Sequence, residues 1–237
     1  MLKKFENQIK TFQDRFGTDI IMAEQGSTAW LQCRLGVITS SEIGDAIAGL
    51  KTKTRNTYLC KLVAEVAAGM IEEINSKYME WGKMHESAAR ATYEFKNNCV
   101  IDQTGLIFRD ETFREGCSVD GFIRGQNKVA EVKCPYNTTN YIKFLLNDDV
   151  KKEWALQCQH QMRCTGADVV DIIQYDPRMM VSPLHVLTFE RDQKTQEMFD
   201  ELIPAFIQDM DTMLEMIGIK YGQQWERLAV KEKAGVA

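Results

Sequence analysis

The chain has 237 residues, which is enough for one large domain with a buried core and does not require two. Hydrophobic residues make up 44% and charged residues 27%, and no stretch approaches the ~20 apolar residues that span a bilayer, so no membrane association is expected. The net charge of −5 argues against a protein that coats nucleic acid non-specifically, but it permits an enzyme that gathers positive charge in one channel.

Apolar residues spaced three or four apart predict helices in the first part of the chain. The first stripe, from Phe5 to Phe16, is closed by Gly17, and Ser27 or Thr28 can cap the next helix. We expect helices at about 1–16, 27–35, 41–48, 57–70 and 79–97, and a basic polar loop at 49–57.

The period then changes to two, which is typical of strands, and a turn at 125–127 predicts a hairpin. We expect strands at 99–109, 117–124, 128–134, 168–176 and 183–190, and helices at about 150–165 and 192–216. This order predicts a single α/β domain over 1–237, with a mixed central sheet flanked by helices. The polar tail after about 226 is expected to be flexible.

The seven cysteines are scattered, and no two of them form a CxxC pair. Dispersed reduced thiols favour a cytoplasmic protein over a disulfide framework, a zinc site or an iron–sulfur cluster. The chain begins with a basic segment that no apolar run follows, which argues against a secretory signal.

The two hairpin strands at 117–124 and 128–134 carry the most informative charged residues. Glu131 and Lys133 are two apart, so on a strand they point to the same face, and Asp120 lies on the neighbouring strand. Two carboxylates a few ångströms apart bind a hard divalent cation through oxygen. Such a cation activates water and stabilises a transferring phosphoryl group, and a neighbouring lysine can orient that water. The alternative is a surface hairpin on which Glu131 and Lys133 merely pair.

Two further polar groups are candidates for the same site. Glu86 is a third carboxylate that can approach the cation or its water, although it can also form a surface pair with Arg90 one helical turn away. Gln157 and Gln161 share one face of the helix expected at 150–165, and glutamine can orient water. From the residues alone, packing and surface exposure are the preferred explanation for that helix.

Short segments in consistent order together resemble the bacteriophage lambda exonuclease family, the YqaJ-like viral recombinases of the PD-(D/E)xK nuclease superfamily. The segments are Glu24-Gln-Gly26, Ala29-Trp30, Arg34 to Thr39, Ser41-Glu42, Trp81-Gly-Lys83, Cys117-Ser118, Asp120-Gly121, Lys133-Cys-Pro135, Tyr175 to Met179 and Gln224-Trp225. Between Ser118 and Asp120 the family has a proline, whereas this chain has Val119. This difference leaves the ligands intact. The resemblance implies a restriction-endonuclease-like fold.

The resemblance also implies residue roles around two Mg²⁺ ions, for which Mn²⁺ can substitute. The metal ligands that it implies are Asp120, Glu131 and the backbone carbonyl of Val132. The groups that it implies for positioning the attacking water are Lys133, Glu86 and Gln157.

A terminal 5′-phosphate is the second feature that the resemblance implies, held by Arg34, Ser41 and Ser118. A guanidinium and two hydroxyls suit a phosphate dianion. The alternatives are a helix C-terminal position for Arg34 and a helix cap for Ser41. Trp30 can stack near the separating DNA end or lie in the core.

The activity implied is 5′→3′ digestion of one strand of linear double-stranded DNA to mononucleotides, which leaves a 3′ single strand. The resemblance further implies a ring-shaped homotrimer, a single-strand annealing protein as partner, and a phage or prophage origin in a bacterial host. The residues expected to track the duplex are Lys51, Lys53 and Arg55, unless they form a solvated loop. The rivals are an endonuclease of the same superfamily and a non-catalytic protein that binds DNA ends.

Overall fold

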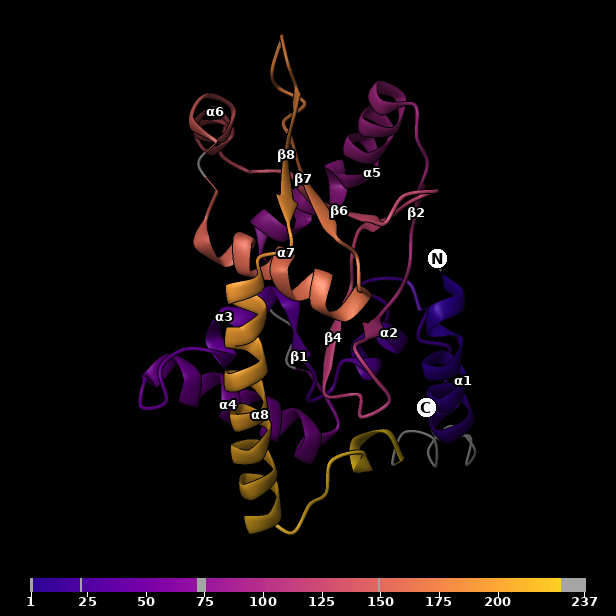
Figure 1. The fold of residues 1–237 in the computed structure, drawn as a ribbon, viewed down its shortest axis with the longest axis vertical. Coiled ribbons are helices and arrows are strands. Elements are labelled where there is room, and N and C mark those ends of the chain that lie inside the picture. The colour runs from indigo at the N-terminus through magenta and orange to yellow at the C-terminus, as the bar shows by residue number, and fades with distance from the viewer. Residues whose placement is uncertain (1, 22, 72–75, 149, 227–237) are drawn as a thin grey trace.

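The bounds of the elements come from a computed structural model that describes residues 2–21, 23–71, 76–148 and 150–226 (Figure 1). The strands are β1 (Ile38–Thr39), β2 (Ile101–Asp102), β3 (Ile107–Phe108), β4 (Glu115–Cys117), β5 (Gly121–Ile123), β6 (Lys128–Lys133), β7 (Val169–Tyr175) and β8 (Leu184–Glu190). The α-helices are α1 (Glu6–Phe16), α2 (Thr28–Cys33), α3 (Ile43–Ala46), α4 (Lys53–Ala68), α5 (Lys77–Asn97), α6 (Thr138–Asn147), α7 (Lys152–Thr165) and α8 (Gln193–Met216). Two 3-10 segments, η1 (Leu2–Phe5) and η2 (Ser40–Glu42), precede α1 and α3.

The larger sheet has the strand order β2-β5-β6-β7-β8. Strands β5 and β6 form an antiparallel hairpin, and β6 pairs with β7 in parallel from Lys128 opposite Val169 to Lys133 opposite Gln174. Parallel neighbours need a long crossover connection, and α6 and α7 supply it. The sheet is therefore mixed, as the sequence predicts.

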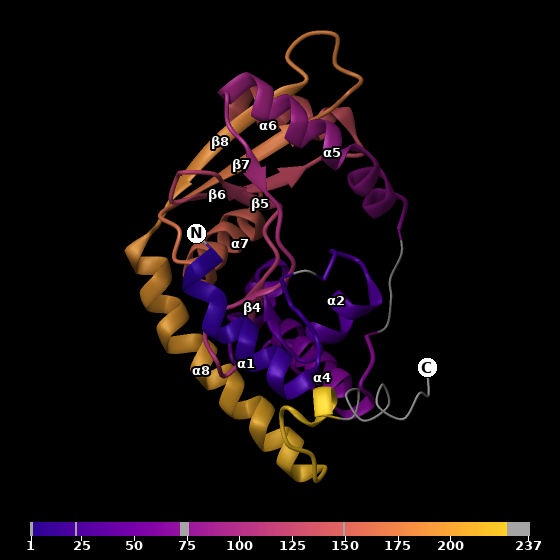
Figure 2. The same ribbon diagram turned by 90° about the vertical axis from the view of Figure 1, so that its right-hand side faces the viewer.

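Helices cover both faces of this sheet, as Figures 1 and 2 show. Alternate residues of β6 point to opposite faces. Val129 packs in one cluster with α7 residues such as Cys158, whereas Ala130 packs in another with α5 residues such as Ala89 and Tyr93. Glu131 shares the α7 face with Val129, so its side chain lies between the sheet and that helix.

The smaller sheet has the order β1-β4-β3. Strands β1 and β4 run parallel, with Thr39 opposite Gly116. A Cβ atom on Gly116 would lie 3.1 Å from the carbonyl oxygen of Ile107 on β3, so this position favours glycine. Helix α7 packs against both sheets and thereby fixes their relative placement.

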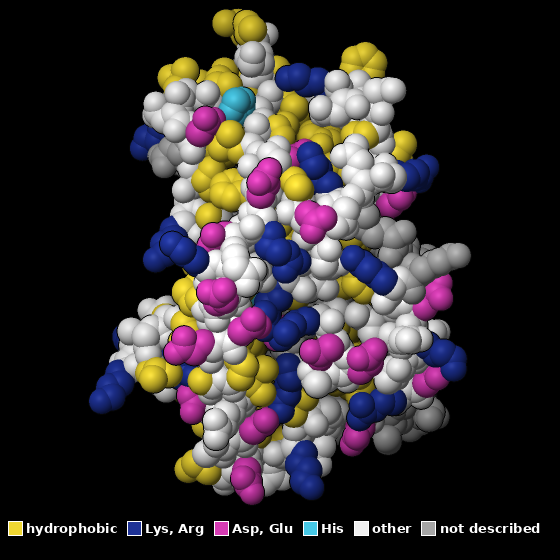
Figure 3. Space-filling view, in the orientation of Figure 1, with side chains coloured by type: hydrophobic (Ala, Val, Ile, Leu, Met, Phe, Trp, Pro, Cys, Tyr) yellow, Lys and Arg dark blue, Asp and Glu magenta, His cyan; other side chains and the backbone are white. Residues whose placement is uncertain are grey.

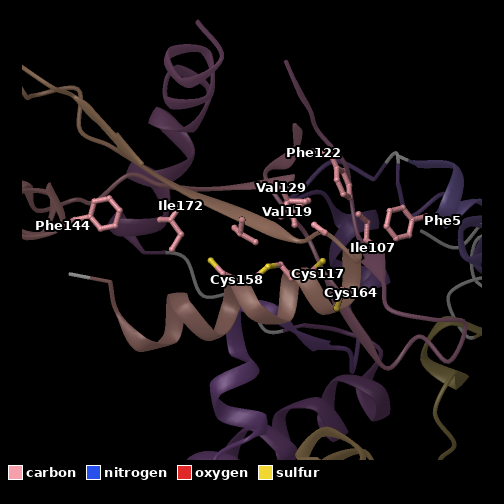
Figure 4. Close-up of a cluster of buried hydrophobic side chains, with 13 residues drawn as sticks. Phe5, Ile107, Cys117, Val119, Phe122, Val129, Phe144, Cys158, Cys164 and Ile172 are labelled. Atoms are coloured by element: carbon pink, nitrogen blue, oxygen red, sulfur yellow. The ribbon is translucent and has the colours of Figure 1, made fainter. Parts of the chain in front are cut away.

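Besides the cluster of Ala130 with α5, three buried clusters of described residues stabilise this arrangement around the sheets. The cluster in Figure 4 joins Phe5 and Phe122 to α7 and the larger sheet. A second cluster packs α8 against α3 and α4. The third is aromatic: the Phe12 ring of α1 lies 5.3 Å from that of Phe108 and 5.0 Å from that of Trp225.

Most of the expected elements are present, and the hairpin through 125–127 is confirmed. The expected strands 99–109 and 117–124 are wrong as single strands, because each is divided between the two sheets. Between β2 and β3, the amides of Gly105 and Leu106 bond to the segment at 20–21 instead. Helix α6 was not expected from the sequence, and the expected flexible tail lies outside the described residues.

Candidate active site

Asp120 lies where β5 begins, directly beside β6. Its backbone amide donates to the carbonyl of Ala130 at 3.1 Å, and its Oδ2 accepts from the amide of Val132 at 2.5 Å. Both bonds hold the carboxylate against the edge of β6. The next residue, Gly121, lets β5 approach β2 closely, because a Cβ atom there would lie 2.2 Å from Ile101 Cγ2 on β2.

Glu131 and Lys133 point to the same face of β6, as the sequence predicts. Lys133 Nζ lies 2.5 Å from Glu131 Oε1 and 3.1 Å from Gln157 Oε1. The Lys133 and Glu131 side chains are 21% and 6% exposed, so the pair does not lie on an open surface. Burial lowers the pKa of Lys133, but Glu131 and Asp120 outweigh it and raise that pKa above its usual value. The lysine is therefore a protonated cation.

Two glutamines of α7 complete the coordination of the Glu131 carboxylate. Gln157 Nε2 donates to Glu131 Oε1 at 2.8 Å, and Gln161 Nε2 donates to Oε2. Gln161 is fully buried, and its own Oε1 has no partner in the described part of the chain. Gln159 points away and bonds to Glu190 and Asp192, so the position facing the site is Gln157.

Two interactions describe the surroundings of Glu86. It pairs with Arg90 one turn along α5, and its side chain is 32% exposed. It also lies close enough to Asp120 to act on it electrostatically: burial and then the carboxylates of Glu131 and Glu86 raise the pKa of Asp120 well above its usual value. The site therefore holds more negative charge than Lys133 alone neutralises.

The donor set suits a hard divalent cation. No group of three Asp, Glu, His or Cys side chains forms a metal cluster among the residues that the structure describes. Mg²⁺, however, often takes only one or two carboxylates and completes its shell with water and substrate oxygen. In a strand, the amide and carbonyl of one residue point to the same side, so the Val132 carbonyl points toward Asp120, beyond the end of the paired part of β5. Crowded carboxylates beside a backbone oxygen fit such a cation.

A second polar group lies at the adjoining end of the smaller sheet. Because Thr39 pairs with Gly116 in parallel, Ser41 and Ser118 each follow two residues later and emerge at the same end. The Trp30 indole donates to Ser118 Oγ at 2.8 Å. Ser118 is also two residues from Asp120, so this group and the carboxylates share one short segment.

Arg34 connects the hydroxyls of this group. Its guanidinium lies 4.3 Å above the Trp30 ring and donates to Thr39 Oγ1 at 3.4 Å, and that hydroxyl lies 3.4 Å from Ser41 Oγ. Neither of these two partners carries a charge. Burial lowers the pKa of Arg34, which the more distant Glu42 and Glu65 oppose without cancelling. Through Trp30 and Thr39, the structure thus links Arg34 to the hydroxyls of Ser118 and Ser41.

The alternative readings of these residues are partly right. Arg34 does cap the C-terminus of α2. Ser41 is not a helix cap, because Thr39 is the N-cap residue of η2 and Glu42 that of α3. Trp30 is half-buried and is bonded inside the site, so it combines core packing with a place beside the predicted phosphate ligands.

The expectation that 49–57 is a loop throughout is wrong. Helix α4 begins within it at Lys53, because the Thr52 side chain caps the helix by accepting from the Arg55 amide at 3.3 Å. Arg55 is 4% exposed and bonds to Asp209 on α8 at 2.7 Å, so it joins two helices and does not face solvent. Lys51 and Lys53 are exposed.

Gln161, which the sequence places on one helix face with Gln157, contacts Glu131. Two further contacts were not predicted. Thr39 joins Arg34 to Ser41 without any motif of its own. The Gln224-Trp225 pair is structural: the two side chains donate to the carbonyls of Leu35 and Gln32, and so fasten the end of the described chain to the segment around Arg34.

A mixed sheet between helices, with a partly buried Asp, Glu and Lys set on its central strands, defines a restriction-endonuclease-like fold. The sequence profile of the YqaJ-like viral recombinase domain matches residues 29–168, more than half of the chain. The chain belongs to this family.

Similar proteins agree with that placement. The putative uncharacterized protein ExoD of Escherichia coli K12 is 38% identical over 86 residues, which are 35% of this chain and 99% of that protein. The alkaline exonuclease LHK-Exo of Laribacter hongkongensis superposes with a TM-score of 0.74 at 27% identity, over 89% of this chain and 100% of that one. A phage-related exonuclease of Haemophilus somnus 129PT shares the fold, with a TM-score of 0.66 at 12% identity, over 77% of this chain and 96% of that one.

Proposed function

We propose that this chain is a divalent-metal-dependent exonuclease. It digests one strand of linear double-stranded DNA from the 5′ end, releases mononucleotides, and leaves a 3′ single strand for single-strand annealing recombination. The observation that carries the proposal is the joining of the Asp120, Glu131 and Lys133 set to the Arg34, Ser41 and Ser118 set through one three-residue segment. The similarity to LHK-Exo, described as an alkaline exonuclease and also solved with dAMP, supports the same activity.

The carboxylates and the lysine have separable tasks in hydrolysis. Asp120, Glu131 and the Val132 carbonyl would hold Mg²⁺, two ions per site, with Mn²⁺ as a substitute. When bound, the metal lowers the pKa of a water and stabilises charge on the phosphoryl group. Lys133, which contacts Glu131 and Gln157, would orient the attacking water and stabilise developing charge.

Gln157 and Glu86 would hold the reacting groups in position. The Gln157 side chain bonds to both Lys133 and Glu131, which fixes the ammonium and the carboxylate relative to each other. Glu86, which pairs with Arg90 and acts electrostatically on Asp120, would bind the attacking water. A positioned proton acceptor of this kind contributes about 10²–10⁴-fold to a rate.

The Arg34, Ser41 and Ser118 set would bind the terminal 5′-phosphate. The immediate contacts of the Arg34 guanidinium are Thr39 and Trp30, which are uncharged, so the guanidinium can pair with a phosphate dianion. The two hydroxyls would donate to the same phosphate from the end of the smaller sheet. This set explains why digestion would start at an end. An endonuclease needs no such binding group.

The proposed function also involves a homotrimeric assembly and a protein partner. The face in Figure 3 carries acidic and basic side chains interspersed, without a broad basic surface. A ring-shaped homotrimer would reconcile this surface with DNA binding by lining an inner channel with basic groups, among them Lys51 and Lys53. The partner would be a single-strand annealing protein, and the setting the cytoplasm of a bacterial host. The structure contains, within its described residues, no helix with the length and apolar character that crossing a membrane requires.

The test is digestion of linear duplex DNA with a 5′-phosphate, the same duplex with a 5′-hydroxyl, and closed circular DNA, each with Mg²⁺ and with chelator. We expect mononucleotides from the phosphorylated duplex only in Mg²⁺, slower release from the hydroxyl end, and intact circles. Cleaved circles would favour the endonuclease. Binding of ends without any release would favour a non-catalytic protein.

A further inference from the structure

An aromatic cluster lies beside the candidate active site and has no part in the chemistry described above. Tyr78 and Trp81 belong to the first turns of α5, and Tyr136 follows β6. The Tyr136 ring centroid lies 5.2 Å from that of Tyr78 and 5.8 Å from that of Trp81, and both pairs meet edge to face. We call these three residues the aromatic platform.

Two cations surround the aromatic platform. Lys77 Nζ lies 5.4 Å from the centroid of Tyr78 and 5.2 Å from that of Tyr136. The Arg178 guanidinium lies 4.4 Å from the centroid of Trp81 and donates to the carbonyls of Tyr136 and Pro135. Arg178 therefore fixes both the base of the platform and the loop that carries Tyr136.

The three rings differ in what they offer to a ligand. Trp81 has the His85 ring 4.1 Å away in addition to the Arg178 contact, and its Nε1 is buried. Trp81 therefore supports the other two rings and is not part of the accessible surface. Tyr78 is 56% and Tyr136 37% exposed, so these two rings form its accessible surface. Exposed aromatic groups held in place by cations mark a binding surface.

The aromatic platform shares both of its elements with the candidate active site. Tyr136 follows Lys133 by three residues, and Glu86 follows Trp81 by five, or about 7.5 Å along the helix. A strand with its phosphate at Asp120 and Glu131 therefore has neighbouring bases within reach of Tyr78 and Tyr136.

We propose that the aromatic platform stacks a nucleobase of the single-stranded DNA segment whose phosphate lies at the Asp120 and Glu131 site. This inference rests on the proposed function. Aromatic rings interleaved with lysine and arginine are the recognition chemistry of single-stranded nucleic acid, with rings for the bases and cations for the phosphates. Every base has a π face, so the platform holds the strand without reading its sequence.

The test uses a single-stranded, 5′-phosphorylated oligonucleotide with 2-aminopurine at the second position, titrated with the full chain in chelator. Wild-type protein is expected to quench the fluorescence. Tyr136→Ala is expected to weaken binding about 5- to 150-fold and to remove most of the quenching, and Tyr78→Ala to act in the same direction. Tyr136→Phe keeps the ring and should bind within about twofold of wild type.

Phe95→Ala is the matched control, because Phe95 is 91% exposed on the same helix, about 25 Å from Tyr78. If Tyr136→Ala and Tyr78→Ala bind and quench like wild type and Phe95→Ala, the aromatic platform is not a base-binding surface. The same result overturns it even when wild-type protein digests DNA in Mg²⁺, which leaves the proposed function standing. Wild-type protein that neither binds nor digests DNA overturns both.

Discussion

Replacing Glu115 by glutamine removes a charge at the junction of β4 and α7, the two elements that lead to Ser118 and carry Gln157. Glu115 is 4% exposed, and its carboxylate lies 2.6 Å from Arg109 Nη1 and 2.8 Å from Arg163 Nε. Burial alone would raise its pKa, but His160 and Arg163 overcome this effect and lower the pKa from 4.5 to about 2.

The size and sign of the effect follow from these pKa values. At about 1.4 kcal/mol for each pH unit between 4.5 and 2, the ionised Glu115 contributes about 3 kcal/mol to the free energy of unfolding. Because the folded-state pKa is the lower one, this contribution is present above the unfolded-state pKa and is lost as the pH falls toward about 2. The acid sensitivity of wild-type protein therefore includes this loss, whereas that of Glu115→Gln does not.

The assay is urea unfolding of both proteins, followed by circular dichroism at several pH values from about 7 to about 2. Other carboxylates titrate in both proteins, so the difference between the two curves reports on Glu115 together with its partner His160. We expect the wild-type advantage at neutral pH to shrink by about 3 kcal/mol across the acid range. Two curves that stay parallel from neutral to acid pH would refute the assignment of Glu115 as an ionised, paired carboxylate.

Three further substitutions test particular contacts. Gln161→Leu removes the donor to Glu131 Oε2 and is expected to lower kcat about 10- to 100-fold, with Tm little changed; an unchanged kcat would make the contact purely structural. Gly121→Ala places a Cβ atom 2.2 Å from Ile101 Cγ2 and should destabilise the fold by about 1–3 kcal/mol or more, measured by urea unfolding; wild-type stability would contradict the close approach of β2 and β5. Arg34→Lys loses the planar fork, so the rate advantage of 5′-phosphorylated over 5′-hydroxyl ends should shrink; an unaltered ratio would exclude Arg34 from phosphate binding.

The sequence was most informative where one element carries the whole pattern. The spacing of Glu131 and Lys133 on one strand predicts their shared face, and the structure confirms it. The helix at 192–216 and the strands at 168–176 and 183–190 carry long, regular patterns, and each forms within a few residues of its expected bounds.

Features that depend on distant segments were not predictable. The division of 99–109 into two strands results from the backbone at 20–21 passing between them, which no local pattern encodes. The local sequence around Arg55 predicts a solvent-exposed cation. Its partner Asp209 lies far along the chain, so the buried ion pair was not predictable. The convergence of Arg34, Ser41 and Ser118 likewise depends on the parallel pairing of β1 with β4, and the sequence alone indicated it only through family resemblance.

The most direct measurement of the central claim is single-turnover digestion of 5′-phosphorylated linear duplex by wild-type protein and Lys133→Ala, with DNA binding measured in parallel. Since Lys133 contacts Glu131 and Gln157, its loss should lower mononucleotide release by at least about 10²-fold. Binding of the duplex should stay within about tenfold of wild type, because other groups hold the DNA. Release by Lys133→Ala at the wild-type rate would contradict the account.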